Sequence, residues 1–358
     1  MALHFHTLTV KDIRRETADC ISVEFDIPQN LQQQFNFTQG QSITIRKFIN
    51  DEELRRSYSI CSSPFENELR VAIKKVNNGL FSTFANTQLK KGDALEVMPP
   101  SGNFNTALVT THKKNYLAFA AGSGITPVIS IIKTTLAAEP RSNFTLVYGN
   151  RNTSSIIFKE ALENLKDKYL ERFSIIYVLS RERMEAEINY GRIGREKCEQ
   201  FSQVINFKTT DEIFLCGPEE MIFGVKDFLE IKGFNKKNIH YELFATPLRK
   251  SVNIQTVSST ETNMQTSGIT VKLDGRSFDF DLDYNSNNIL DAALAQGADL
   301  PFACKGGVCT TCRAKLVEGK VEMEVNYGLE EDEVAAGFIL TCQSHPRSEK
   351  VVVDFDVK

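Results

Sequence analysis

One stretch of the sequence decides the fold of its last part: Pro301-Phe302-Ala303-Cys304-Lys305-Gly306-Gly307-Val308-Cys309-Thr310-Thr311-Cys312. Its three cysteines stand at a C-x4-C-x2-C spacing, and Cys342 follows after 29 further residues. Four thiolates at this spacing can hold a [2Fe–2S] cluster. The small residues between them permit the tight turns that a loop around a cluster needs, and backbone N–H groups can then point at the sulfurs. We therefore predict four metal ligands: Cys304, Cys309, Cys312 and Cys342.

Other uses of these cysteines fit the pattern less well. A structural zinc site normally pairs two short-spaced knuckles, whereas Cys342 stands alone. No histidine lies inside the Cys304–Cys312 loop, so a Rieske centre does not fit. Disulfides are disfavoured in a reducing cytoplasm. The loop instead resembles the cluster loop of plant-type ferredoxins, and this resemblance, over residues 268–358, implies an α+β domain of the β-grasp fold.

The sequence before this unit divides into three parts. Residues 247–267 are rich in Ser, Thr, Asn and Gln, which is typical of an exposed linker. Residues 1–107 alternate short β-rich runs with turns, and this favours an antiparallel β-barrel or sandwich. Residues 108–246 alternate apolar strands such as Tyr116–Ala121 with helical segments such as Val128–Ala138. That alternation predicts a doubly wound α/β parallel sheet, so the predicted fold class is multidomain.

Composition excludes several other classes of protein. The 358 residues suggest two or three domains, and 41% hydrophobic with 25% charged residues argues against global disorder. A net charge of −4 argues against general nucleic-acid binding. The first residues lack the pattern of a signal peptide, and the longest apolar stretch, Tyr116–Ile132, is short and interrupted by glycine and proline. We therefore expect a soluble, cytoplasmic protein without a membrane anchor.

Two motifs in the first part form a candidate flavin site. Arg56-Ser57-Tyr58-Ser59 resembles the R-x-Y-[ST] motif of the ferredoxin–NADP reductase superfamily, although Arg and Tyr on a barrel are often only surface residues. The resemblance implies that Arg56 pairs with the FAD pyrophosphate and that Tyr58 lies against the isoalloxazine ring. It also implies that Ser59 hydrogen-bonds near flavin N5, the hydride acceptor. Ser57 belongs to the same predicted FAD contact.

The second flavin element of this superfamily is the segment Val71–Thr83, in which a strand leads through Asn78-Gly79 into a short helix. Gly79 permits the turn, and the first amides of the helix can then face a pyrophosphate. An ordinary β-to-α turn would have the same appearance. The residues predicted to contact FAD here are Lys74, Gly79, Leu80, Phe81 and Ser82.

The second part contains a candidate nicotinamide loop, Gly122-Ser123-Gly124-Ile125-Thr126-Pro127, between a strand and a helix. Glycines let the backbone approach a phosphate, and proline fits the first turn of a helix. The sequence is not the G-x-G-x-x-G fingerprint but is similar to the superfamily's G-x-G-[IV]-[TA]-P motif. Its predicted cofactor contacts are Gly122, Ser123, Gly124, Thr126 and Pro127.

A second nicotinamide motif ends a later strand. Cys216-Gly217-Pro218-Glu219-Glu220-Met221 resembles the superfamily's C-G-P-x-x-M motif, which implies that Cys216 stands near nicotinamide C4 and shapes its approach. Cys216 and Ser59 are the two predicted catalytic residues, although a buried structural cysteine is the alternative for Cys216. The remaining predicted contacts are Gly217, Pro218, Met221 and Phe244, and Phe244 could instead be a core residue.

The coenzyme preference depends on Ser180-Arg181, directly after another strand. A Ser-Arg pair at this place binds the 2′-phosphate of NADPH in plant-type reductases, and Arg151 and Arg183 are near in sequence. Arginine suits a phosphate, but surface arginines are common and NADH-dependent relatives vary here. The pattern favours NADPH over NADH.

Together the motifs predict an electron route from NAD(P)H to FAD, then to the [2Fe–2S] cluster and out to a partner oxygenase. The chain resembles oxygenase reductases with a C-terminal ferredoxin domain, above all those serving phenylacetyl-CoA epoxidases in phenylacetate catabolism. Reductases of aromatic-ring, alkane or steroid oxygenases are the alternatives, with a flavin and iron–sulfur redox sensor further behind. Residues 268–358 carry a net charge of −7 and the rest +3, so the acidic domain could dock on a basic partner surface.

Overall fold

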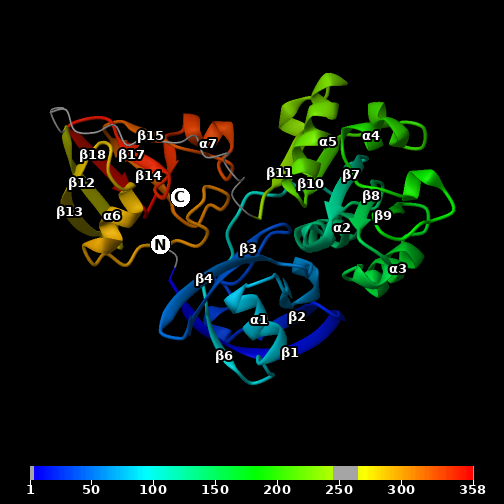
Figure 1. Ribbon diagram of the computed structural model, residues 1–358, viewed down its shortest axis with the longest axis horizontal. Helices are drawn as coiled ribbons and strands as arrows, with labels where there is room; N and C mark the ends of the chain where they lie inside the picture. Colours follow the sequence, from blue (N-terminus) through cyan, green and yellow to red (C-terminus); the bar gives the residue numbers. More distant parts are fainter. Residues whose placement is uncertain (1–3, 245–264, 358) are drawn as a thin grey trace. The chain divides into compact units, whose positions relative to one another are not determined.

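The computed structural model describes residues 4–244 and 265–357, and the chain forms two compact units (Figure 1). The larger unit comprises Phe5–Phe244, and the smaller one contains the described residues 265–357. No helix among the described residues is both long and apolar enough to cross a membrane. Residues 247–264 of the predicted linker, which spans 247–267, lie outside the described residues. Its last two residues, Thr266 and Ser267, belong to strand β12 (Thr266–Leu273).

The first part of the larger unit is an antiparallel barrel. Its sheet has the order β4-β3-β6-β1-β2-β5. A bridge between Ile60, directly after β4, and Val71 in β5 joins the two edge strands and closes the sheet. The elements are β1 (His6–Thr17), β2 (Cys20–Asp26), β3 (Ser42–Ile49), β4 (Glu52–Ser59), β5 (Leu69–Lys74), helix α1 (Leu80–Thr87) and β6 (Ala94–Val97).

Alternation along the barrel strands sends every second side chain inward, where β-branched and other apolar residues pack. Phe81 and Ala85 of α1 belong to the same core, so the short helix is anchored on the barrel. The fully buried strand residues of this core include Leu8, Val10, Val23, Ile43, Ile45, Val71, Ile73 and Val97.

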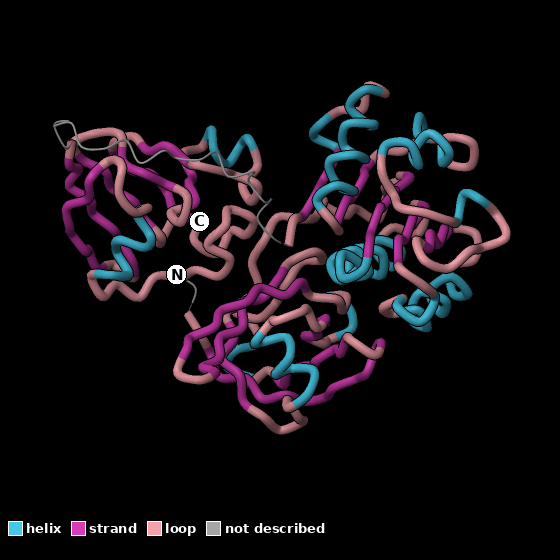
Figure 2. The backbone as a smooth tube through the Cα atoms, viewed as in Figure 1, coloured by secondary structure: helices cyan, strands magenta, loops and turns pink. Residues whose placement is uncertain are grey.

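The second part of the larger unit is a five-stranded parallel sheet of order β11-β10-β7-β8-β9. Because β8 and β10 lie on opposite sides of β7, the strand order reverses there, and ligands of such sheets bind at the carboxyl edge beside the reversal. Its elements are β7 (Asn115–Ala121), α2 (Ile125–Ala138), β8 (Asn143–Asn150), α3 (Lys159–Lys168), β9 (Phe173–Leu179), α4 (Arg195–Phe201), β10 (Glu212–Cys216), α5 (Glu219–Ile231) and β11 (Ile239–Glu242). Figure 2 shows helices gathered around this sheet, whereas strands dominate the barrel.

A polar seam joins helix α2 to the barrel. The Ser130 hydroxyl donates to the Ser62 carbonyl oxygen at 2.7 Å, and the Thr134 hydroxyl donates to Ser63 Oγ at 3.0 Å. Both α2 side chains are buried. Because buried hydroxyls need partners, this seam fixes the barrel against the parallel sheet within the larger unit.

The smaller unit is a mixed sheet of order β13-β12-β18-β14-β16 with a separate pair, β15 and β17. Strands β12 and β18 are parallel, and the other pairings are antiparallel. Helix α6 places Ile289 and Leu290 in the core against the sheet. The elements are β12 (Thr266–Leu273), β13 (Arg276–Asp283), α6 (Ile289–Ala295), β14 (Arg313–Glu318), β15 (Val321–Met323), α7 (Glu331–Ala335), β16 (Phe338–Leu340), β17 (Ser344–Pro346) and β18 (Lys350–Asp354). The three sheets confirm the predicted fold class of barrel, doubly wound sheet and α+β ferredoxin-type domain.

Candidate functional site

The two predicted flavin motifs meet in the barrel. The ring of Tyr58, near the end of β4, lies 5.7 Å from the ring of Phe81 in α1, centroid to centroid. The Ser57 hydroxyl oxygen lies 3.2 Å from the hydroxyl oxygen of Thr44 on the neighbouring strand β3, and the two share a hydrogen bond. Arg56 is exposed and donates one N–H to the Arg55 carbonyl oxygen at 2.7 Å. Burial raises the pKa of the Tyr58 phenol, so this ring stays protonated.

The turn before α1 requires glycine. A Cβ on Gly79 would lie 2.4 Å from Val76 Cγ2 and 2.5 Å from Ser82 Oγ. The Ser82 hydroxyl accepts from the Val76 amide and donates to the Gly79 carbonyl, so this side chain builds the turn itself. Leu80 is partly exposed and Phe81 is buried. The backbone amides at the start of α1 therefore remain the groups suited to a pyrophosphate.

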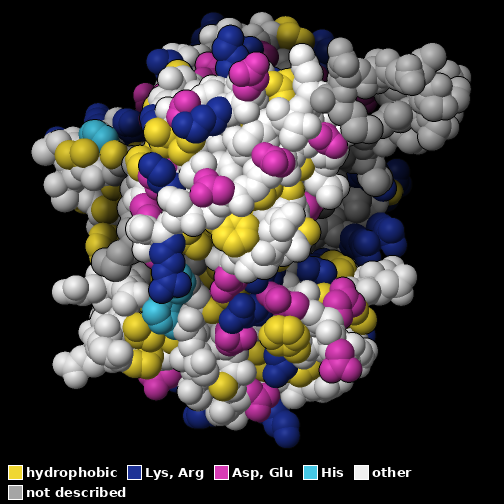
Figure 3. All heavy atoms as spheres, turned by 90° about the vertical axis from the view of Figure 1, so that its left-hand side faces the viewer, with side chains coloured by type: hydrophobic (Ala, Val, Ile, Leu, Met, Phe, Trp, Pro, Cys, Tyr) yellow, Lys and Arg dark blue, Asp and Glu magenta, His cyan; other side chains and the backbone are white. Residues whose placement is uncertain are grey.

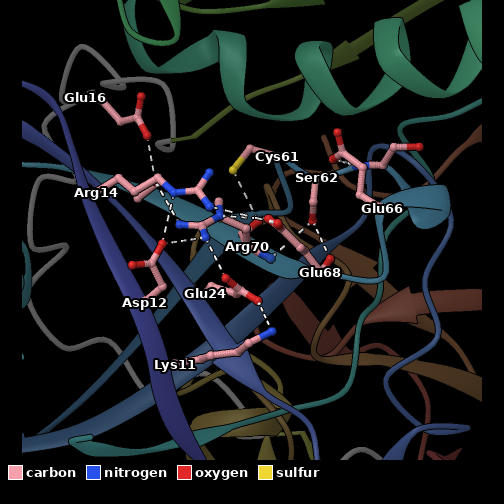
Figure 4. Close-up of polar contacts among 12 residues, drawn as sticks. Lys11, Asp12, Arg14, Glu16, Glu24, Cys61, Ser62, Glu66, Glu68 and Arg70 are labelled. Atoms are coloured by element: carbon pink, nitrogen blue, oxygen red, sulfur yellow. Dashed lines mark hydrogen bonds and ion pairs between the residues drawn. The ribbon is translucent and has the colours of Figure 1, made fainter. Parts of the chain in front are cut away.

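A network of charged side chains from strands β1, β2 and β5 lies beside Cys61 and Ser62, which follow β4 (Figure 4). Arg70 of β5 is 5% exposed and binds Glu24 at 2.7 Å, Asp12 at 2.9 Å and Glu68 at 3.1 Å. Its backbone carbonyl oxygen accepts from the Cys61 amide and thiol at 2.8 Å and 3.3 Å. Arg70, together with Lys11 and Arg14, thus balances the charge of three carboxylates next to the residues that follow β4.

The nicotinamide loop after β7 touches the loop after β10. A Cβ on Gly124 would lie 2.1 Å from the Cys216 carbonyl oxygen, and one on Gly217 would lie 2.7 Å from Met221 Cε. Gly122 has a φ of +55°, in the left-handed region that glycine adopts freely. These contacts bring both predicted nicotinamide motifs together at the carboxyl edge of β7 and β10.

Side chains on that same loop shape its backbone. The Thr126 hydroxyl donates to the Ser123 carbonyl oxygen at 3.0 Å. Pro127 stands in the first turn of α2, where a missing N–H costs nothing. Lys74 comes from the barrel, yet its Nζ lies 3.9 Å from the position of a Cβ on Gly122 and 3.7 Å from Asp19 Oδ2. A lysine predicted to contact FAD therefore lies beside the nicotinamide loop as well.

Three side chains from both domains meet beside this loop. Ser59 Oγ donates to Glu242 Oε2 at 3.2 Å, and Glu242 pairs with Cys216 in the register of β11 and β10. Burial raises the pKa of Glu242 to about 7, and the Ser59 hydrogen bond partly opposes this rise. Burial also raises the pKa of the Cys216 thiol, so it stays protonated, in keeping with a group that shapes the nicotinamide's approach.

Glu242 was not among the predicted site residues, although it stands two residues before the predicted contact Phe244. The signal lay in its position: a carboxylate directly after a run of strand residues, at the carboxyl edge of a sheet. Phe244 is 45% exposed, so the alternative of a core phenylalanine does not hold.

The predicted coenzyme-specificity segment lies beyond β8 and β9. The Ser180 amide and the Arg181 amide donate to the carbonyl oxygens of Asn150 and Arg151, which extends the strand pairing past the sheet edge. Arg181 and Arg151 are exposed, and neither forms an ion pair among the described residues. Glu182 accepts two 2.7 Å hydrogen bonds from Thr153, one from its amide and one from its hydroxyl.

The four cysteines of the predicted cluster lie in contact in the smaller unit. Cys309 Sγ is 3.1 Å from Cys304 Sγ. Cys304 accepts hydrogen bonds from the thiols of Cys309 and Cys342, which lowers the pKa of the Cys304 thiol. Hydrogen bonds with the sulfurs of Cys304 and Cys312 raise the pKa of Cys342. The sulfurs therefore form one connected group that includes all four predicted ligands.

This arrangement suits a binuclear cluster. Among the described residues no group of three or more His, Cys, Asp or Glu side chains is placed to hold one metal ion, so the assignment of the four sulfurs to a cluster rests on their spacing and their mutual contacts. A [2Fe–2S] cluster takes two thiolates on each iron. The Gly306 amide also donates to Cys304 Sγ at 3.3 Å, as expected for a loop whose amides point at the sulfurs.

Comparison with known families matches each part of the chain to a cofactor-binding domain. Residues 7–106 match the oxidoreductase FAD-binding domain and residues 119–227 match the oxidoreductase NAD-binding domain. Residues 271–347 match the 2Fe-2S iron-sulfur cluster binding domain. The FAD, nicotinamide and [2Fe–2S] cofactors predicted from the motifs are thus confirmed at the level of domains.

Full-length relatives have the same three domains. The chain is 45% identical to one of the subunits of the 1,2-phenylacetyl-CoA epoxidase of Escherichia coli (strain K12), over 99% of this chain and 98% of that one. It is 32% identical to the ferredoxin reductase component of 3-ketosteroid-9-alpha-monooxygenase from Rhodococcus rhodochrous, over 97% and 96% of the two chains. The structure of phthalate dioxygenase reductase superposes with a TM-score of 0.58 over 98% of both chains, at 23% identity, and so shares the fold.

Proposed function

Because the chain belongs to the family of oxygenase reductases that includes this component of the Escherichia coli 1,2-phenylacetyl-CoA epoxidase, we propose that its own partner is a phenylacetyl-CoA epoxidase of phenylacetate catabolism. The chain is an oxidoreductase with FAD-binding, NAD-binding and [2Fe–2S] domains. The observation that carries the proposed partner is 45% identity over nearly the whole of both chains, against 32% for the steroid monooxygenase component.

Flavin and cluster together divide the two electrons of a hydride into single electrons, and the residues of this chain hold the reactants in place. In this proposal Arg56 and the first amides of α1 bind the FAD pyrophosphate, and Tyr58 packs against the flavin ring. Ser59, Cys216 and Glu242 surround the nicotinamide end of the coenzyme. The contact of the two loops at Gly124 supports this, because it brings both nicotinamide motifs together at the carboxyl edge of the sheet, where dinucleotides bind.

Glu242 acts in this proposal through its charge. A nicotinamide that gives up a hydride becomes a cation, and an ionised carboxylate nearby stabilises that developing charge. Its pKa of about 7 means that the ionised fraction changes most steeply near neutral pH. Ser59 supports the ionised form by donating its hydroxyl hydrogen to Glu242 Oε2.

NADPH is the proposed electron donor. Arg151 and Arg181 are exposed on adjacent loops at the sheet edge, and arginine binds phosphate oxygens well. Their acidic neighbour Glu182 accepts hydrogen bonds from the amide and the hydroxyl of Thr153, which hold its carboxylate against that loop. Steady-state kinetics with NADPH and NADH side by side test this, and an equal or higher kcat/KM for NADH would refute it.

The domain boundaries remain part of the proposal: FAD in residues 1–107, the nicotinamide in 108–246 and the cluster in 268–358. Electrons would leave through the last domain, whose net charge of −7 suits a basic partner surface. On the face shown in Figure 3, acidic side chains are interspersed with basic and hydrophobic ones, so docking would rest on the overall charge. We also place the reaction in the cytoplasm, because it consumes NAD(P)H and the eight cysteines are free thiols.

The deciding experiment couples the purified holoprotein to a purified phenylacetyl-CoA epoxidase and measures NAD(P)H-dependent epoxidation of phenylacetyl-CoA. We expect product to form in proportion to the coenzyme consumed. The proposal is wrong if the chain reduces cytochrome c rapidly but supports no epoxidation by an epoxidase that is active with its own reductase. The chain would then serve another oxygenase.

A further inference from the structure

One buried amide side chain links the two halves of the cysteine site. Gln343 follows Cys342 directly and is 8% exposed. Its Nε2 lies 3.1 Å from the carbonyl oxygen of Lys305, 2.8 Å from that of Cys342 and 3.6 Å from Cys342 Sγ. Lys305 stands next to Cys304, 38 residues away in the sequence.

The rest of Gln343 is held on every side. The backbone N–H of Gln343 donates to the Leu340 carbonyl oxygen at 2.9 Å, and the backbone carbonyl oxygen of Gln343 accepts from the backbone N–H of Glu324 at 2.8 Å. The aliphatic part of the side chain lies beneath Gly307, because a Cβ there would be 3.2 Å from Gln343 Cγ. With backbone and side chain both fixed, the amide nitrogen has little freedom to turn away from the sulfur.

We infer that Gln343 is a positioning residue for the cluster: the two N–H groups of its side-chain amide bind the carbonyl oxygens of Lys305 and Cys342, hold the Cys304 loop against Cys342, and are shared with the Cys342 sulfur at 3.6 Å. The two loops carry ligands that are far apart in sequence, and no covalent bond joins them. A hydrogen-bond donor on a ligating sulfur also stabilises the negative charge that reduction adds, which raises the reduction potential. The inference rests on the [2Fe–2S] cluster but not on which oxygenase receives the electrons.

Two full-length variants test both parts of this role. Gln343→Glu keeps the shape of the side chain but replaces the donor with a carboxylate, and Gln343→Leu removes all its polar atoms. Gln296→Glu is the matched control, because it makes the same charge change at an exposed residue of the same unit. Iron content and visible absorbance report cluster occupancy, and a redox titration followed by the EPR signal reports the cluster potential.

We expect the cluster potential to move negative in both variants, further in Gln343→Glu, and to stay unchanged in Gln296→Glu. Loss of the cluster to a chelator should be on the order of 10-fold faster in both Gln343 variants. Reduction of FAD by NAD(P)H should keep its rate, since that site lies in the other unit.

Each alternative outcome also decides the question. A variant that stays folded and keeps FAD but assembles no cluster supports the positioning role. Clusters with unchanged potential and unchanged stability in both variants would overturn the inference. Unfolding of the smaller unit in both variants, seen by hydrogen exchange, would also overturn it, because Gln343 would then be a folding residue. None of these readouts involves the oxygenase, so a wrong partner assignment would leave them intact.

Discussion

Ser59 Oγ donates a 3.2 Å hydrogen bond to Glu242 Oε2, although 183 residues separate the two in sequence. Ser59 ends β4 of the barrel and Glu242 ends β11 of the parallel sheet. The bond therefore joins the barrel to the parallel sheet, at the place where we propose that the nicotinamide gives its hydride to the flavin.

Glu242→Gln should change the pH dependence of flavin reduction. The wild-type rate is expected to rise with pH through about 7, as the carboxyl group ionises. The variant should be roughly 10- to 100-fold slower above that pH, with a flat profile. Stopped-flow absorbance of FAD under excess NAD(P)H measures both. Ser59→Ala removes a hydrogen bond that lowers the pKa of Glu242, so the pH profile of this variant should shift to higher pH. A wild-type pH profile in Glu242→Gln would show that Glu242 does not act in the site.

The same carboxyl group gives a stability signature. Its folded pKa is raised above the ordinary value of 4.5, so its contribution to stability is complete below that value and is lost as the pH rises through about 7. Relative to Glu242→Gln, the wild-type protein should lose stability between about pH 5 and about pH 8. Thermal denaturation across this range checks the sign. A constant difference between the two proteins would mean that Glu242 does not titrate there.

Cys309→Ser should separate the two redox steps. The variant loses one of the four predicted ligands, so iron content and the visible absorbance of the cluster should fall. Reduction of cytochrome c should be lost, while reduction of FAD by NAD(P)H continues. Cys198→Ser replaces a buried cysteine of α4 in the nicotinamide domain, and it should keep the cluster. A folded Cys309→Ser protein that also fails to reduce FAD would contradict a serial route.

Arg181→Ala should weaken NADPH selectively. Loss of a charge-assisted contact with phosphate is worth about 1.5–3 kcal/mol, which corresponds to roughly a 10- to 100-fold fall in kcat/KM. The value for NADH should change little. Arg195→Ala, at an exposed residue of α4, is the control. Equal losses for both coenzymes would show that Arg181 binds a part that NADPH and NADH share.

Arg70→Met should destabilise the barrel by about 1.5–3 kcal/mol, because the buried Glu24 loses its guanidinium partner but keeps Lys11 at 2.6 Å. Arg14→Met is the matched control: Arg14 also binds Asp12 but is 58% exposed, and such pairs are worth at most about 1 kcal/mol. Urea denaturation compares the two variants. A loss below about 1 kcal/mol in Arg70→Met would show that the network can rearrange.

The network also predicts acid sensitivity. The hydrogen bond from Arg70 lowers the pKa of Asp12 below its ordinary value of 3.8. Asp12 therefore stabilises the fold above that pH, and the stabilisation is lost as the pH falls through its lower folded pKa. In Arg70→Met the loss should begin at higher pH, which acid denaturation monitored by circular dichroism would show.

Local patterns were enough to predict the fold class and the cofactors. The four cysteines are recognised by spacing, and the loops at Gly79 and Gly124 by glycines that the structure requires in place. Two functional contacts were beyond reach of such patterns. Glu242 gains its role from pairing with Cys216 and touching Ser59, and Gln343 gains its role from a loop 38 residues away. Both depend on how segments that are far apart in sequence pack together, which local patterns do not specify.

A Cβ on Gly124 would lie 2.1 Å from the Cys216 carbonyl oxygen. Any substitution of Gly124, in evolution or in the laboratory, therefore requires both loops to change their backbone conformation. The exposed segments around Arg151 and Arg181, at the same sheet edge, carry no such restriction. Coenzyme preference can therefore diverge between relatives while the reacting end of the site is inherited intact. The exposed side chains of Arg151, Arg181 and Arg183 are the ones to exchange when a reductase must be adapted to another coenzyme pool.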